Sequence, residues 1–274
     1  MTTIAQLLAQ SGLPPLEARM LLERVLEQTR AWLIAHADEA AGPEAEKAFG
    51  ALVERRHRGE PIAYILGKRE FYGLEFQVTR AVLIPRPETE LLVDLALARI
   101  PENSAQRVLD LGTGSGAIAV ALAKARPRAR LTAVEVDYAA LSVARANAKQ
   151  HAVSVRFFCG DWFGALPGER FDLIVSNPPY VAAGDAHLEL GDVRFEPQRA
   201  LLGGADGLDC IRAIVGKAGA HLNPGAWLLI EHGYDQAGAC RALLEAEGYG
   251  EVQSWPDLAG IARVSGGVRG AGRP

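Results

Sequence analysis

The residues from Asn177 to Tyr180, Asn-Pro-Pro-Tyr, combine groups that can hold a planar nitrogen group. They follow Phe171–Val175, an apolar run with the length and composition of a buried strand. Pro178 and Pro179 lack an N–H and end any sheet ladder, and Pro178 also moves Asn177 away from helical geometry. The Asn177 side-chain carbonyl and the Pro178 backbone carbonyl then offer two acceptors, and Tyr180 adds an aromatic face. This set suits the NH2 of a carboxamide or an exocyclic amine, although a proline turn with a capping Asn would have the same sequence.

A glycine-rich turn between a strand and a helix indicates where a cofactor binds. Gly112, Gly114 and Gly116 occupy every second position, whereas the dinucleotide-binding fingerprint is G-x-G-x-x-G. Asp110 beside the turn repels a pyrophosphate but can attract an ammonium. Glu135, at the end of the next strand, can accept hydrogen bonds from both ribose hydroxyls, or it can simply neighbour a helix N-cap. These charges favour S-adenosylmethionine, an adenosine that bears an amino acid, over NAD.

A third strand-end loop contains residues suited to the surroundings of an adenine. Asp161 can accept a hydrogen bond from the exocyclic amine, and Trp162 can line a ring face or make contact through its backbone. A tryptophan at such a position is as often part of the core.

Strands and helices alternate from Arg107 onward, the pattern of a doubly wound α/β sheet with right-handed crossovers. The expected strands are 108–111, 131–135, 153–158, 171–175 and 226–231, with a closing pair at 251–255 and 261–268. The expected helices are 117–125, 139–150, 207–221 and 236–247. Such sheets bind ligands at the carboxyl ends of their strands, where all three loops lie. The Gly- and Arg-rich tail after Val268 is expected to fray.

The beginning of the chain has a different periodicity. Residues 1–68 carry apolar residues such as Leu21 and Leu22 at helical spacing, which predicts a small bundle of four or five short helices. These helices either only pack together or dock a substrate, and we expect a docking domain. Residues 69–82 alternate aromatic and polar residues around a glycine, which predicts a β-hairpin linker. Residues 83–274 are expected to form the catalytic domain.

Composition restricts the possible partners and compartments. The formal net charge of −4 over 274 residues gives no global attraction for nucleic acid. The basic run 55–58 is more typical of the solvated face of a helix than of a phosphate-binding site. The cysteines Cys159, Cys210 and Cys240 are few and far apart, and the histidines lack metal-ligand spacing. We therefore expect no disulfides and no metal. The start of the chain lacks signal-peptide features, and no apolar run approaches the ~20 residues of a membrane helix, so we expect a cytoplasmic protein.

The chain resembles the class I S-adenosylmethionine-dependent methyltransferases, and more narrowly the peptide chain release factor glutamine methyltransferases. The resemblance covers nearly the whole chain, from the helical N-terminal domain and the hairpin to four motifs. These are Ile84–Glu90, Asp110–Ala117, Ser176–Tyr180 and Gly191–Pro197. The first and the last motif are more specific than the shared cofactor loop. The resemblance implies a Rossmann-like, mainly parallel seven-stranded sheet whose last strand is antiparallel.

The same resemblance implies a reaction and its residues. The reaction is methyl transfer from S-adenosyl-L-methionine to the side-chain amide nitrogen of the glutamine in the Gly-Gly-Gln motif of class I release factors. The implied cofactor contacts are Gly112, Thr113, Gly114, Ser115, Gly116, Glu135, Trp162 and Asn177. The implied substrate pocket is Asn177, Pro178, Pro179 and Tyr180, with Asn177, Pro178 and Tyr180 in the catalytic role. The family more often has Asp at position 135, so Glu135 and Asp137 remain alternative ribose ligands.

Direct in-line transfer is the expected mechanism, because no Cys, Lys or His near the motif is placed for a covalent intermediate. The carbonyls of Asn177 and Pro178 would accept the two amide hydrogens and orient the nitrogen. The main alternative is an adenine amino methyltransferase acting on nucleic acid, which would have to flip its base. The acidic balance disfavours it, and we expect no stable nucleic-acid binding. A non-catalytic adenosyl-ligand sensor would not need paired acceptors, and an NAD dehydrogenase is disfavoured by the glycine spacing.

Overall fold

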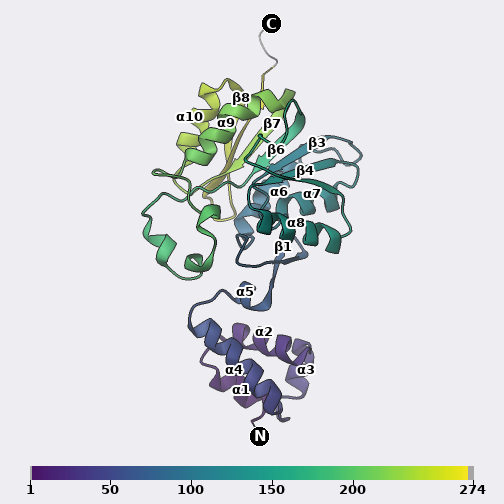
Figure 1. Ribbon diagram of the computed structural model, residues 1–274, viewed down its shortest axis with the longest axis vertical. Coiled ribbons are helices and arrows are strands. Elements are labelled where there is room, and N and C mark those ends of the chain that lie inside the picture. The colour runs from purple at the N-terminus through teal and green to yellow at the C-terminus, as the bar shows by residue number, and fades with distance from the viewer. Residues whose placement is uncertain (1, 271–274) are drawn as a thin grey trace. The chain divides into compact units, whose positions relative to one another are not determined.

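A computed structural model describes residues 2–270 of the chain (Figure 1). These residues form two compact units. Unit 1 contains the residues up to Lys68 together with Glu189–Phe195, and unit 2 contains Arg69–Leu188 and the residues from Glu196 onward. Each unit has a hydrophobic core and is described by itself.

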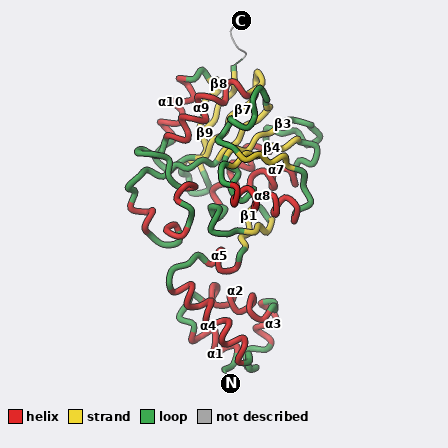
Figure 2. Tube along the Cα trace, in the orientation of Figure 1, coloured by secondary structure: helices red, strands yellow, loops and turns green. Residues whose placement is uncertain are grey.

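Unit 1 is a bundle of helices, as the spacing of its apolar residues predicts (Figure 2). The helices are α1 (Ile4–Gln10), α2 (Pro15–Leu26), α3 (Arg30–Ala35), α4 (Pro43–His57) and α5 (Ile62–Leu66). Pro15 and Pro43 each occupy the first helical position, where the missing N–H costs no hydrogen bond. Leu21 and Leu22 of α2 and Phe49 of α4 are buried between the helices, so the bundle has its own apolar core.

A segment from the second half of the chain, Glu189–Phe195, packs with the helices of unit 1. The Asp192 carboxylate is 3.2 Å from a guanidinium nitrogen of Arg56. Arg194 donates a hydrogen bond of 2.8 Å to the backbone carbonyl of Arg58. The backbone that follows the Asn-Pro-Pro-Tyr loop therefore belongs to unit 1 for a short stretch before it returns to unit 2.

Unit 2 contains a two-stranded hairpin and a seven-stranded sheet. The hairpin consists of β1 (Lys68–Phe71) and β2 (Leu74–Gln77). The sheet strands are β3 (Arg107–Leu111), β4 (Arg130–Glu135), β5 (Val155–Cys159), β6 (Phe171–Ser176), β7 (Leu222–Glu231), β8 (Tyr249–Pro256) and β9 (Ala262–Arg269), in the order β5-β4-β3-β6-β7-β9-β8. β9 pairs antiparallel with both β7 and β8, and the other paired neighbours are parallel. The predicted doubly wound sheet with an antiparallel last strand is confirmed.

Helices cover both faces of this sheet. They are α6 (Glu90–Leu97), α7 (Ala117–Ala125), α8 (Tyr138–Gln150), α9 (Asp209–His221) and α10 (Ala237–Ala246). Val108 and Leu173 share a buried cluster with α6, α7 and α8. Leu109 and Ile174 share the other cluster with α9 and α10. Successive side chains of a strand point to opposite faces, so adjacent residues of β3 and β6 feed two separate cores and the middle of each strand is mainly apolar, with the buried Asp110 as the exception in β3.

Several predicted boundaries are shifted by one or two residues, and the largest error is the start of β7. β7 begins at Leu222 and not at Ala226, because Leu222 pairs with the first residue of β6 across a register shift despite the Asn-Pro-Gly segment that follows it. β9 extends to Arg269, which pairs with Tyr249 of β8, so the tail after Val268 begins within a paired strand. Residues 271–274, the rest of that tail, lie outside the described residues. Within the described part of the chain, no helix is both long and apolar enough to cross a membrane.

Candidate active site

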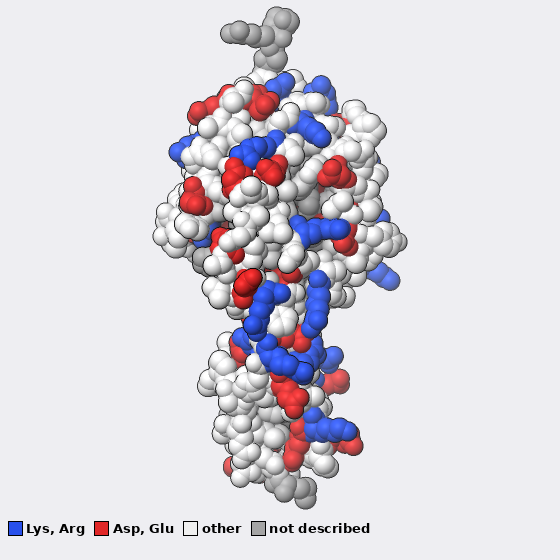
Figure 3. All heavy atoms as spheres, turned by 60° about the vertical axis from the view of Figure 1, so that its left-hand side comes forward, with Lys and Arg blue, Asp and Glu red and all other residues white. Residues whose placement is uncertain are grey.

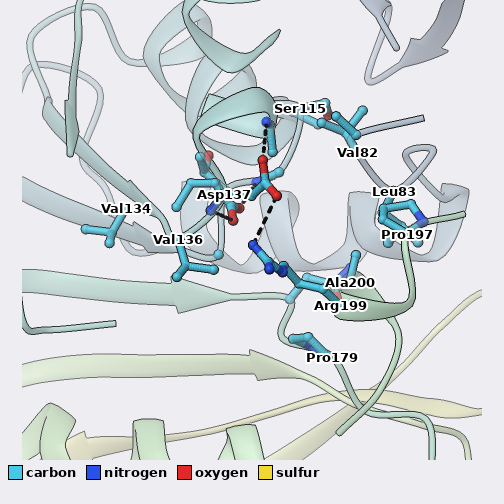
Figure 4. Close-up of a pocket in the computed structure, with 18 of the residues that line it drawn as sticks. Val82, Leu83, Ser115, Val134, Val136, Asp137, Pro179, Pro197, Arg199 and Ala200 are labelled. Atoms are coloured by element: carbon cyan, nitrogen blue, oxygen red, sulfur yellow. Dashed lines mark hydrogen bonds and ion pairs between the residues drawn. The ribbon is translucent and has the colours of Figure 1, made fainter. Parts of the chain in front are cut away.

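A pocket of about 460 Å³ lies in unit 2 at the carboxyl ends of four neighbouring strands (Figure 4). Its walls come from the segments after β3, β4, β5 and β6, and from two flanking stretches. The lining includes Val82, Pro85, Arg86, Thr89, Gly112–Ser115, Glu135–Asp137, Gly160–Trp162, Asn177, Pro179 and Pro197–Ala200. The loops singled out in the sequence therefore surround one cavity, at the edge where open α/β sheets bind ligands.

The glycine-rich turn is shaped by its backbone. Gly112, Gly114 and Gly116 have φ values of +70°, +56° and +81°. The N–H groups of Gly112 and Thr113 donate to one carbonyl oxygen of β4, at 2.9 and 3.1 Å. Gly116 precedes α7 and does not line the pocket; a Cβ there would lie 3.1 Å from the Cβ of Ala144 in α8. A glycine at position 116 therefore allows α7 to pack closely against α8.

Asp110 lies behind the turn and not in the pocket wall. It is fully buried, and its Oδ2 accepts a 2.6 Å hydrogen bond from the Thr113 hydroxyl. Burial raises the pKa of Asp110 to about 7, although the hydrogen bond from Thr113 lowers it. Its carboxyl group therefore holds the glycine-rich turn from behind, through the hydrogen bond from Thr113.

Glu135 and Asp137 have different partners. The Glu135 carboxylate is buried, and it accepts the N–H of Gly114 at 2.9 Å and that of Asp137 at 3.0 Å, one on each oxygen. Asp137 is the N-cap of α8 and accepts two backbone N–H groups through Oδ1. Its Oδ2 pairs with Arg199 at 3.0 Å, as Figure 4 shows. Asp137 is thus occupied by the helix and an arginine, whereas each Glu135 oxygen keeps a lone pair.

Trp162 lies at the pocket wall with an uncommon backbone conformation. Its φ is +45°, in the left-handed region that bulky residues rarely adopt. A Cβ at Gly112 would be 3.4 Å from Cζ3 of Trp162, so the indole ring packs against the glycine-rich turn. Asp161 is exposed beside it and also lines the pocket.

The nitrogen and the oxygen of the Asn177 side-chain amide have different surroundings. Its Nδ2 donates a 3.1 Å hydrogen bond to the Thr89 hydroxyl, whereas its Oδ1 has no hydrogen-bond partner within residues 2–270. The preceding residue, Ser176, is buried and donates to the Leu111 carbonyl of β3 at 2.7 Å, which fixes the end of β6. Asn177 therefore presents a free carbonyl oxygen at the pocket wall.

The remaining residues of the motif lie in different surroundings. Pro179 lines the pocket, but Pro178 is buried and Tyr180 is half-buried, and neither is part of its lining. The Tyr180 hydroxyl donates to the Glu231 carboxylate at 3.4 Å, and its backbone carbonyl accepts from Gln236 at 3.0 Å. Burial, with the Glu231 carboxylate, raises the pKa of Tyr180, so its phenol remains a donor at neutral pH.

Sequence reasoning missed the side chains that support these loops. Thr89 and Glu231 contact the Asn-Pro-Pro-Tyr loop from sequence positions far from it. Arg86 lines the pocket and donates to Glu196 at 2.5 Å, and the Glu196 side chain is fully buried. Arg86 and Glu196 lie in the two most specific sequence motifs, and this position could have indicated that they support the site. For Glu231, the only indication in the sequence is an acidic residue at the end of an apolar strand.

The surface charges of unit 2 are mixed in sign. On its face in Figure 3, Lys and Arg side chains stand beside Asp and Glu. At the pocket, Arg199 pairs with Asp137 and Arg86 pairs with Glu196. Among the described residues, no three His, Cys, Asp or Glu are grouped so that they could hold a metal ion.

Comparison with known protein families matches two parts of the chain. The PrmC N-terminal domain family matches residues 1–67, and the Methyltransferase small domain family matches residues 89–202. The release factor glutamine methyltransferase of Bordetella pertussis is 54% identical over 268 residues, which cover 97% of this chain and 99% of that protein. The protein of the same name from Burkholderia pseudomallei is 53% identical over 272 residues, covering 97% and 95%.

Solved structures share the sheet and its helices. A T. thermophilus 16S rRNA methyltransferase in complex with AdoMet and guanosine superposes with a TM-score of 0.55 at 25% identity. The match covers 74% of this chain and 49% of that one.

Proposed function

The chain belongs to the release factor glutamine methyltransferase family, and on this basis we propose how its residues carry out the reaction. The substrate is the glutamine side chain in the Gly-Gly-Gln motif of class I peptide chain release factors, which receives a methyl group on its amide nitrogen. S-adenosyl-L-methionine is the cofactor and, when bound, supplies an electrophilic methyl group on a sulfonium.

We assign the adenosine to the pocket wall formed by the glycine-rich turn, Glu135 and Trp162. Glu135 is a suitable ribose ligand because backbone N–H groups hold its carboxylate while each oxygen retains a lone pair. Asp137 is less suitable, since it caps α8 and pairs with Arg199. Gly112–Ser115 let the backbone come close to the ligand, and the indole of Trp162 provides a flat wall.

Asn177 carries the chemical part of the proposal. The single observation behind it is that Thr89 occupies the Asn177 Nδ2, which leaves Oδ1 as an acceptor at the pocket. The Oδ1 and the Pro178 carbonyl would accept the two hydrogens of the substrate amide, and Pro179 and Tyr180 would border it. Held in this way, the nitrogen lone pair is turned toward the methyl group, and both hydrogen bonds strengthen as positive charge develops on the nitrogen. The nitrogen–methyl bond would form as the methyl–sulfur bond breaks with its electron pair left on sulfur, and the nitrogen would then release one of its two hydrogens as a proton to solvent.

We further propose that residues 1–68 dock the release factor, that 69–82 act as the hairpin linker and that 83–274 form the methyltransferase domain. The match of residues 1–67 to a domain family of its own supports a separate role for the helices. A release factor substrate also suits a cytoplasmic protein that does not bind nucleic acid stably.

The test is methyl transfer by the Asn177→Ala variant. We expect kcat to fall by about two orders of magnitude, the usual loss of one oriented polar group, with little change in the Kd for S-adenosyl-L-methionine. Asn223→Ala is the matched control, because Asn223 bonds to Asp172 at the opposite edge of the sheet. Labelled cofactor is incubated with purified release factor or with nucleic acid, and mass spectrometry locates the methyl group. Label on adenine, or wild-type turnover by Asn177→Ala, would refute the proposal.

A further inference from the structure

We propose that Asn147 of α8 is a positioning residue for cofactor binding, because its side-chain amide holds two walls of the pocket in place. One wall is the glycine-rich turn at Ser115, and the other is the segment 81–83 that follows the β1–β2 hairpin. The inference rests on the assignment of S-adenosyl-L-methionine to this pocket in the proposed function. Asn147 does not line the pocket itself, so it acts through the backbone that it holds.

The Asn147 side chain is fully buried and bonds to two segments that are distant in the sequence. Its Nδ2 donates to the Ser115 carbonyl at 2.8 Å and to the Gln77 carbonyl at 3.0 Å. Its Oδ1 accepts the N–H of Gln77 at 2.7 Å. Both hydrogens of the NH2 group are therefore used, and one amide joins the turn after β3 to the end of β2.

The chemistry of these partners fixes the orientation of the Asn147 amide. The carbonyl oxygens of Ser115 and Gln77 only accept, so both must meet the NH2 end of the amide. A flipped amide would place its oxygen against two other oxygens and its NH2 against an N–H. Buried polar groups that lose their partners destabilise a protein strongly. Only one orientation of Asn147 therefore satisfies all three backbone groups.

α8 approaches the glycine-rich turn through two residues on one face. Ala144 and Asn147 are three positions apart, the spacing of neighbours on the surface of a helix. A Cβ at Gly116 would lie 3.1 Å from the Cβ of Ala144, so the turn packs closely on this face. The bond to Asn147 directs the carbonyl of Ser115, a pocket-lining residue, toward α8. Loss of the amide would release the backbone of this turn.

The other segment held by Asn147 leads directly into the pocket wall. Gln77 is the last residue of β2, and residues 81–83 line the pocket shortly after it, as the position of Val82 in Figure 4 shows. Val82 is buried, and its N–H donates to the Thr79 carbonyl at 3.1 Å, so a short turn connects the strand to the wall. A shift of Gln77 would therefore move this wall.

A second side chain of α8 binds the hairpin but does not bond to the glycine-rich turn within residues 2–270. Gln150 donates to the Glu75 carbonyl at 2.8 Å and accepts from the side-chain amide of Gln77 at 3.0 Å. It is exposed, whereas Asn147 is buried. Asn147 thus differs from Gln150 in its reach to Ser115, and the two residues form a matched pair for an experiment.

The first test is the Kd for S-adenosyl-L-methionine of Asn147→Ala, measured by isothermal titration calorimetry. We expect the Kd to rise about tenfold, the effect of about one well-placed hydrogen bond. The kcat at saturating cofactor should remain largely unchanged, because Ser176 and Thr89 hold the Asn177 loop independently. General damage would have the opposite signature: a smaller folded fraction lowers kcat and the binding stoichiometry, and the remaining folded protein keeps its Kd.

Gln150→Ala is the matched control. It removes hydrogen bonds between α8 and the hairpin but leaves the bond from Asn147 to Ser115. We expect its Kd for S-adenosyl-L-methionine to equal that of the wild type. An equal increase in Kd for Gln150→Ala and Asn147→Ala would overturn the inference, since the hairpin contacts alone would then explain the effect.

Asn147→Ser is a second variant, which serves if the alanine variant does not fold. Its hydroxyl has one hydrogen and can donate to the carbonyl of Ser115 or of Gln77, but not to both. We expect a Kd above that of the wild type and no higher than that of Asn147→Ala. A wild-type Kd for Asn147→Ser would overturn the inference.

Glu135→Ala separates this inference from the proposed function. If Glu135→Ala weakens cofactor binding while the Asn147 variants keep the wild-type Kd, only the positioning role is overturned. If Glu135→Ala leaves the Kd unchanged, the assignment of the cofactor to this pocket is refuted instead.

Discussion

The two loops that meet at the pocket are held by different kinds of contact. The glycine-rich turn after β3 is fixed by backbone N–H groups that donate to β4 and to Glu135 at the end of that strand. The loop after β6 depends on side chains, because Asn177 is oriented by Thr89 and Tyr180 is bonded to Glu231. The first loop therefore tolerates most changes in its own side chains, although the carboxylates of Glu135 and Asp110 also hold it. A side-chain-held loop can lose its working orientation through a single substitution.

The largest effect that separates the two loops is expected from Glu135→Ala. It removes the proposed ribose ligand and should weaken S-adenosyl-L-methionine binding by about 1.5–3 kcal/mol, the range for a hydrogen bond to a charged group. Asn177→Ala should leave the same Kd nearly unchanged. Isothermal titration calorimetry of both variants measures their Kd for S-adenosyl-L-methionine. If both variants weakened binding equally, the two loops would not have separate functions.

Gly116→Ala tests whether the first loop depends on its backbone. The new Cβ would force a left-handed residue with φ near +81° and approach Ala144 to 3.1 Å. We expect the free energy of unfolding in urea to fall by about 2 kcal/mol. Gly225→Ala is the control, since Gly225 has a φ of +78° but no atom within 4 Å of the added Cβ. Similar losses for both variants would assign the whole effect to backbone strain.

Glu231→Gln tests the effect on stability of the buried carboxyl group that accepts from Tyr180 of the second loop. The pKa of Glu231 is raised from 4.5 to about 7, so the folded protein binds this proton more tightly than the unfolded chain. Its contribution to stability is full below pH 4.5 and is lost as the pH rises through about 7. The variant should therefore gain about 2–3 kcal/mol relative to wild type between pH 5 and pH 8.

Urea unfolding at several pH values measures that gain. Asp110, with a pKa of about 7, adds a dependence of the same sign in both proteins and cancels in the difference. A variant that lost stability relative to wild type as the pH rose would contradict the buried, raised carboxyl group.

Asp137→Asn should have the smallest effect. Asparagine caps a helix nearly as well as aspartate, so α8 keeps its N-terminal hydrogen bonds. Only the exposed pair with Arg199 is lost, and such pairs contribute about 0–1 kcal/mol. The Kd for S-adenosyl-L-methionine should change little in a titration that detects Glu135→Ala. A large increase in Kd would identify Asp137 as the ribose ligand.

The sequence alone determined the order of strands and helices, the helical bundle and the loops at one sheet edge. These properties follow from local patterns: apolar runs, helical spacing, and glycines and prolines at strand ends. It misplaced the start of β7, because the pairing of Leu222 with β6 overrides the weak strand propensity of Asn-Pro-Gly. Local patterns also gave no sign of the left-handed backbone at Trp162.

Only the tertiary structure decided which groups of the site are free to act. Asp137 is engaged by α8 and Arg199, whereas the oxygens of Glu135 remain partly available. The amide of Asn177 is oriented by Thr89, which comes from a segment far away in the chain. A hydrogen bond between distant segments leaves no periodic trace in the sequence. Which atom of the amide it engages is known only when the chain is folded.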